Sequence, residues 1–94
     1  MAASNREQIV DEILRLRVSA IIRTPNRESA EAGMTAAVDG GFRMIEFTLT
    51  TPGALDLIAQ FAANPDLLVG AGTVLSTQQA CDAVEAGVYI NLCE

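Results

Sequence analysis

The stretch that decides the fold is Gly40-Gly41-Phe42-Arg43-Met44-Ile45-Glu46-Phe47-Thr48-Leu49. Paired glycines are typical of the point where a helix ends. The five residues from 44 to 48 form a short, mostly apolar run, which predicts a strand. The stretch therefore predicts a helix that ends at the glycines and is followed by a strand.

The same alternation of helix and strand extends in both directions from this stretch. Helical periodicity marks the helices, and short apolar runs mark the strands. The run at 18–22 is mostly apolar and rich in β-branched residues, which predicts a strand buried on both faces. The predicted strands are at 18–22, 44–48, 67–71 and 88–92. A leading helix opens with the capping box Ser4-x-x-Glu7, and a second helix follows Thr24-Pro25 at about 26–39. A third helix follows Thr51-Pro52 and carries the apolar stripe Leu55, Ile58, Phe61 and Ala62, and a fourth opens with the capping box Ser76-x-x-Gln79 and ends at Gly87.

An internal repeat supports this pattern. Residues 37–42, Ala-Val-Asp-Gly-Gly-Phe, resemble residues 83–88, Ala-Val-Glu-Ala-Gly-Val. Repeated βα units imply parallel strands joined by right-handed crossovers. We therefore expect one α/β domain over residues 1–94, with a leading helix and about four βα units. A closed barrel takes eight units, so the pattern alone leaves half a barrel and a small open sheet as alternatives.

Composition excludes several classes of function. The net charge is −6, all six basic residues are arginines, and histidine is absent. An acidic chain without a basic cluster is a poor nucleic-acid binder, and a chain without histidine lacks the usual base and metal ligand. No apolar run is long enough for a membrane span, and the first residues do not form a secretory signal. We expect a cytoplasmic protein without bound metal, in which Cys81 and Cys93 are buried thiols rather than a disulfide.

Glu46 is the most unusual residue of the predicted strands. Alternation places it on the face opposite Ile45 and Phe47, so it would point inward in a barrel. A carboxylate there is costly unless it is paired or protonated, and desolvation would raise its pKa toward the range of a proton-transfer group. The alternative is a structural carboxylate bonded to an arginine such as Arg23.

A glycine-containing turn follows the strand at 67–71. Its sequence, Gly70-Ala71-Gly72-Thr73-Val74-Leu75, begins like a dinucleotide fingerprint, but Leu75 stands at the third glycine position, which disfavours that function. The two glycines indicate a close approach of the backbone to another group, and Thr73 offers a hydroxyl there. The alternative is a tight turn in which Thr73 is a local cap.

Two arginines lie at opposite ends of the predicted strands. Arg23 ends the first strand, where a guanidinium is placed to meet a carboxylate or phosphate. Its alternative role is a surface pair with Glu28 or Glu46. Arg43 precedes its strand, so we expect it at the other rim in a structural role.

Together these segments resemble the aldolases that act on 2-keto-3-deoxy-6-phosphogluconate (KDPG) and 4-hydroxy-2-oxoglutarate (KHG). The matching stretches are residues 18–23, 40–49, 68–75 and 83–87, in agreeing order and spacing. The resemblance implies the N-terminal half of a TIM (β/α)₈ barrel and a class I lyase that needs no cofactor. In that family a lysine forms a Schiff base with the keto carbon, a glutamate shuttles protons, and retro-aldol cleavage releases pyruvate and an aldehyde. The resemblance makes Glu46 the catalytic glutamate and gives Thr73, with Gly72 beside it, contact with the pyruvate portion.

The sequence departs from the family pattern in two ways. Many members carry an arginine that holds the pyruvate carboxylate at the position of Thr50, and here Arg23 is the strand-end guanidinium that would substitute. The Schiff-base lysine lies on a later strand of the family, and this chain contains no lysine. We therefore expect the isolated chain to be inactive.

Two further functions stay open at this point. One is another phosphate-binding barrel enzyme, of the epimerase or thiamine phosphate synthase type, and the other is a non-catalytic half-barrel assembly module. For the aldolase we expect a small 2-keto acid as substrate and a homo-oligomer, either a trimer as in the family or a pair joined at the sheet edges. We expect neither nucleic acid nor membrane as a partner.

Overall fold

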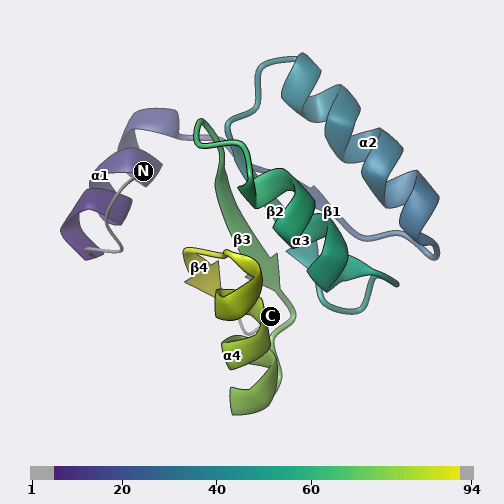
Figure 1. Cartoon of the computed structure of the whole chain (residues 1–94). Coiled ribbons are helices and arrows are strands. Elements are labelled where there is room, and N and C mark those ends of the chain that lie inside the picture. Colours follow the sequence, from purple (N-terminus) through teal and green to yellow (C-terminus); the bar gives the residue numbers. More distant parts are fainter. Residues whose placement is uncertain (1–5, 92–94) are drawn as a thin grey trace.

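The computed structural model describes residues 6–91, in which helices and strands alternate as predicted (Figure 1). The elements are α1 (Arg6–Leu16), β1 (Ala20–Ile22), α2 (Arg27–Asp39), β2 (Met44–Thr48), α3 (Ala54–Ala62), β3 (Leu68–Gly72), α4 (Thr77–Ala86) and β4 (Ile90–Asn91).

The four strands form one parallel sheet in the order β1-β2-β3-β4. Ile21 of β1 pairs with Glu46 of β2, and Glu46 pairs with Gly70 of β3. Each crossover returns the chain beside the strand it has just left, which is the arrangement that repeated βα units predict. The α/β fold with a sequential parallel sheet is therefore confirmed.

The hydrophobic core lies between one face of the sheet and the helices α2, α3 and α4. Ile45 and Phe47 of β2 are fully buried in it, and the Phe47 ring lies 5.3 Å from the ring of Phe61, between centroids. The tilt of 57° between these two rings is an arrangement that aromatic pairs favour. The predicted assignment of Ile45 and Phe47 to the helix side is confirmed.

The three helices that follow strands begin in two different ways. Asn26 and Ser76 cap α2 and α4 through side-chain oxygens that accept the N–H of Ser29 and Gln79. Gly53 precedes α3 with φ of 74° and provides no side-chain cap. Pro25 and Pro52 stand directly before the N-cap residues Asn26 and Gly53, so each of these two helices follows its proline as predicted.

The predicted apolar stripe of α3 needs correction at Leu55. The buried residues of this helix are Ala54, Leu57, Ile58 and Phe61, which follow the i, i+3, i+4, i+7 spacing of a single helical face. Leu55 is 39% exposed. The helix is rotated about its axis so that Leu57 faces the sheet and Leu55 lies at the side of the buried face.

The prediction that the first strand is buried on both faces is wrong. β1 comprises only Ala20–Ile22, and Val18 and Ile21 are 60% and 57% exposed. β1 is an edge strand of this sheet, and the described residues do not cover its inner side. α1 has no buried residue and stands apart from the helical layer in Figure 1.

The last elements also differ from the predictions. β4 (Ile90–Asn91) begins at Ile90 rather than at residue 88, and Cys81 is exposed on α4 rather than buried. The Ser76 capping box is modified, because the Gln79 Oε1 atom accepts the N–H of Leu75 at 2.7 Å. Ser4, Leu92 and Cys93 lie outside the described residues.

Candidate active site

The candidate site lies on the inner face of the sheet, opposite the helices. In neighbouring parallel strands, residues that pair in the register have their side chains on the same face of the sheet. Glu46 pairs with Ile21 and Gly70, so all three lie on this inner face. Two residues further along β2, Thr48 pairs with Gly72. Polar side chains of β2 thus lie beside glycines of β3, toward the carboxyl ends of both strands.

Arg23 joins the ends of β1 and β3. Its Nη2 atom donates a hydrogen bond of 2.8 Å to the hydroxyl of Thr73. Since β2 lies between these strands, and neighbouring strands are about 4.8 Å apart, the Arg23 side chain must cross the end of β2 to reach Thr73. The sequence suggested both residues separately as site residues, and the structure brings them into contact.

Thr73 has an unusual backbone conformation. Its φ of 55° lies in the left-handed region, which is a rare conformation for a β-branched residue. Such strain is typical of functional sites, where the surrounding structure holds the residue in place. Thr73 is not the cap of α4, because Ser76 has that role.

Glu46 and Gly72 fit against each other. Glu46 is 8% exposed, although it lies on the face without helices. A Cβ atom at Gly72 would overlap the Glu46 carboxylate and would lie 3.5 Å from Thr48 Cγ2. Gly72 therefore provides the space in which the carboxylate lies.

A group of threonine hydroxyls surrounds the end of β2. Thr48 Oγ1 lies 3.0 Å from Thr50 Oγ1 and 3.2 Å from Thr51 Oγ1. Thr48 and Thr51 are 3% and 2% exposed, whereas Thr50 is exposed. Thr50 was a predicted site residue, whereas Thr48 and Thr51 were not. Alternation places Thr48 on the face of Glu46, but only the folded loop reveals the contact of Thr51.

Arg43 lies at the opposite rim, as predicted. Its Nη1 atom donates to the carbonyl oxygens of Val38 and Phe42, at 3.0 and 2.8 Å. These carbonyls lie at the end of α2 and in the turn that follows, where a cation is favourable. The structure thus gives Arg43 a structural contact.

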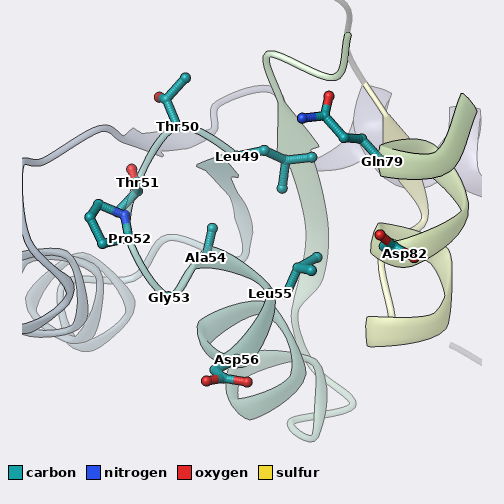
Figure 2. Close-up of a pocket in the computed structure, with 10 residues that line it drawn as sticks. All are labelled: Leu49, Thr50, Thr51, Pro52, Gly53, Ala54, Leu55, Asp56, Gln79 and Asp82. Carbon is teal, nitrogen blue, oxygen red and sulfur yellow. The ribbon is translucent and has the colours of Figure 1, made fainter. Parts of the chain in front are cut away.

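A cavity of about 400 Å³ lies beside the site (Figure 2). The loop from Leu49 to Gly53 forms one wall, and Gln79 and Asp82 of α4 face it across the cavity. Of the predicted site residues, only Thr50 lines this cavity. The four described strands form an open sheet rather than a closed barrel mouth.

Two other kinds of feature are absent from the described residues. Residues 6–91 contain no group of three side chains suited to holding a metal ion. No helix within that range is long and apolar enough to cross a membrane.

Comparison with known protein families shows to which family the chain belongs. The model of the family described as KDPG and KHG aldolase matches residues 9–92. The chain belongs to this family. The match includes all five predicted site residues, which are Arg23, Glu46, Thr50, Gly72 and Thr73.

Individual relatives agree with the family match. The KHG/KDPG aldolase of Escherichia coli K12 is 43% identical over 68 residues, which are 71% of this chain and 32% of the relative. The 2-dehydro-3-deoxy-phosphogluconate aldolase of Zymomonas mobilis is 37% identical over 79 residues, which are 83% of this chain and 38% of the relative. The chain thus spans between 32% and 38% of the length of these two curated aldolases.

Solved structures give the same result. The 2-keto-3-deoxy-6-phosphogluconate aldolase of Zymomonas mobilis, solved with 3-phosphoglycerate, superposes with a TM-score of 0.72 at 35% identity, over 87% of this chain and 40% of the other. The KDPG aldolase of Legionella pneumophila, with pyruvate captured as a covalent carbinolamine intermediate, has a TM-score of 0.62 at 33% identity, over 78% of this chain and 36% of the other. Aldolases of this family have the TIM-barrel fold, so the four strands described here correspond to part of such a barrel.

Proposed function

We propose that this chain supplies the proton-transfer and carboxylate-binding part of a class I aldolase site. The substrate would be 2-keto-3-deoxy-6-phosphogluconate or 4-hydroxy-2-oxoglutarate, which the site cleaves to pyruvate and an aldehyde. The observation that carries the proposal is the Arg23–Thr73 hydrogen bond of 2.8 Å, which joins the ends of the two strands on either side of the buried Glu46 and Thr48. Family membership supports the same chemistry.

Glu46 has the proton-transfer role in this proposal. The reaction begins when an amine adds to the keto carbon, and loss of water gives an iminium ion. A base then takes the proton of the C4 hydroxyl, the C3–C4 bond breaks, and its electron pair moves to the iminium nitrogen to form an enamine. A proton returned to C3 gives the imine of pyruvate, which water hydrolyses. A single buried carboxylate serves as base and then as acid in these steps.

Arg23, Thr73, Gly72 and Thr50 bind the substrate in this proposal. A guanidinium and hydroxyls are suitable donors for a carboxylate. Thr50 stands where many members have an arginine, so the positive charge here comes from Arg23 on the neighbouring strand.

The lysine amine of this mechanism is not among the 94 residues, which contain no lysine. We propose that it belongs to a complementary half barrel, and that the exposed side chains of Val18 and Ile21 pack against that half. A homo-oligomeric assembly and a cytoplasmic location belong to the same proposal. The free, exposed thiol of Cys81 suits a reducing compartment.

Reduction with borohydride in the presence of pyruvate tests this function. The chain alone should give no covalent adduct in intact-mass spectrometry. Mixed with a separately expressed C-terminal half of a family member that carries the lysine, it should restore cleavage and give an adduct on that half. Glu46→Gln should lower cleavage by roughly 10²- to 10⁴-fold, whereas Glu85→Gln on the exposed side of α4 should not. An adduct on this chain alone, or full cleavage with Glu46→Gln, would contradict the proposal.

A further inference from the structure

The loop between β2 and α3, residues 49–53, rests against the loop between β1 and α2 at two points. The N–H of Thr24 lies 3.4 Å from Thr51 Oγ1, and Thr51 is 2% exposed. Two residues later, Gly53 lies against the side chain of Arg27, the first residue of α2. The loop that forms one wall of the cavity is thus supported by two residues that do not themselves line the cavity.

The contact between Arg27 and Gly53 leaves no room for a Cβ atom at position 53 unless Arg27 moves. Such an atom would lie 2.6 Å from Arg27 Cδ, 3.0 Å from Cγ and 3.1 Å from Nε. These three atoms form the part of the side chain that is called the stem below. Gly53 also has a φ of 74°, in the left-handed region that favours glycine. The backbone turn and the Arg27 stem therefore both favour glycine at this position.

Within the described residues, no polar contact holds Arg27 in this position. Its Nε atom is buried and has no hydrogen-bond partner, and the structure records no ion pair of Arg27. A buried donor without a partner is unfavourable, and a positive charge in the first turn of a helix is unfavourable as well. The packing of the stem on Gly53 therefore holds the side chain in place, and its charge does not.

The supported loop carries Thr50, one of the predicted site residues. Thr50 is exposed and lines the cavity, and Figure 2 shows it projecting from the loop between Leu49 and Thr51. On the strand side the loop is fixed, because the N–H of Leu49 donates to the carbonyl of Gly72 at 2.9 Å. On the helix side the loop passes the Arg27 stem at Gly53. A shift of Gly53 would therefore reach Thr50 over only three residues.

We propose that Arg27 is a positioning residue of the aldolase site, because its stem supports Gly53 and so determines where the β2–α3 loop presents Thr50 to the substrate. This inference rests on the proposed function, in which Thr50 binds the substrate, and adds a residue that acts on Thr50 through the loop. The charge of Arg27 has no part in this role. An uncharged side chain of the same length and shape should therefore replace it.

Three variants of Arg27 separate the stem from the charge. Arg27→Met places Cγ, Sδ and Cε where the arginine has Cγ, Cδ and Nε, so it keeps the contact with Gly53 and removes the charge. Arg27→Lys keeps both the stem and the charge, and Arg27→Ala removes both. If the stem positions the loop, the methionine and lysine variants should behave like the unmodified chain, and the alanine variant should differ.

The measurement is cleavage of KDPG by this chain mixed with the separately expressed C-terminal half that carries the lysine. Initial rates of pyruvate release over a range of KDPG concentrations give KM and kcat separately. Arg27→Ala should raise KM about three- to tenfold, because a displaced Thr50 binds the substrate less well, and should change kcat by less than about twofold. Arg15→Ala, at an arginine of α1 whose side chain is 69% exposed, is the matched control and should change neither. In the 94-residue chain alone, the backbone NMR shifts of residues 49–53 should change in Arg27→Ala and stay almost unchanged in Arg27→Met.

Two results would overturn the inference and leave the proposed function intact. One is an unchanged KM in Arg27→Ala while cleavage still depends on Glu46. The other is a KM that Arg27→Lys preserves and Arg27→Met does not, which would mean that the charge acts on the substrate. This second comparison does not depend on how well Arg27→Ala folds. If the unmodified pair of halves shows no cleavage, the proposed function is wrong, and the role of Arg27 in it is wrong as well.

Discussion

The two faces of β2 and β3 are both buried, but for different reasons. On the outer face, Ile45, Phe47 and Val69 are at most 1% exposed because three helices pack on them. On the inner face, Glu46 is 8% exposed and lies in the space that Gly72 leaves, and Thr48 is 3% exposed with its hydroxyl near those of Thr50 and Thr51. The outer face buries apolar area, which stabilises the fold, whereas the inner face buries polar groups that must find partners. Successive residues of the same strands therefore serve different purposes: those on the outer face stabilise the fold, and those on the inner face form the candidate site.

Truncation of the outer face should have the largest effect. Phe47→Ala removes a fully buried ring that packs on Phe61, and we expect a loss of about 3–5 kcal/mol in the free energy of unfolding. Because small domains have only about 5–15 kcal/mol in total, much of the variant should be unfolded at 25 °C. Urea denaturation followed by circular dichroism measures this loss. A loss below about 1 kcal/mol would show that the outer face is not the main source of stability.

An added methyl group on the inner face should have the next largest effect. Gly72→Ala places a Cβ against the Glu46 carboxylate, and we expect a destabilisation of about 1–3 kcal/mol. In a Glu46→Ala background the same change should cost much less, because the carboxylate is gone. The coupling energy from this double-mutant cycle, measured by urea denaturation, isolates the contact. Equal costs in the two backgrounds would mean that Gly72 is required for another reason.

Removal of the N-cap of α4, which lies on neither face of the sheet, should have a smaller effect on stability. Ser76→Ala removes the hydroxyl that accepts the N–H of Gln79 at 3.1 Å, and we expect a loss of about 1 kcal/mol. Thr77→Ala, at the exposed first residue of α4, is the control and should cost less. Chemical denaturation of the pair measures the difference. A larger loss from Thr77→Ala would contradict the assignment of Ser76 as the cap.

The smallest effect on stability should come from the uncovered part of the inner face. Ile21 is 57% exposed, so Ile21→Thr should change the free energy of unfolding by less than about 0.5 kcal/mol. The same substitution should weaken self-association, because exposed apolar groups beside an open strand edge recruit other chains. Light scattering over a range of concentrations measures the association. A chain that stays a monomer at high concentration, with or without the substitution, would contradict this prediction.

Local patterns predicted most of the elements. The run from 44 to 48 became β2 with the same bounds, since its alternation and β-branched residues favour one conformation regardless of partners. Ser76 caps α4 as its capping box predicted, because a cap is a contact with residues two or three positions away. The errors at Leu55 and Ile21 have a different origin. The exposure of Leu55 depends on the phase of α3, and that of Ile21 on which chain segments cover the sheet.

The sequence by itself therefore determined the order of the elements, the parallel sheet and the placement of Glu46 opposite Ile45 and Phe47, because these follow from periodicities of two and 3.6 residues. Only the tertiary structure decided that Arg23 contacts Thr73, 50 residues later in the chain. It alone revealed that Gly72 makes room for Glu46 and that Thr51 connects to Thr24 through a hydrogen bond. Such contacts depend on the register of the strands and on where the loops fold back, and no local periodicity specifies these.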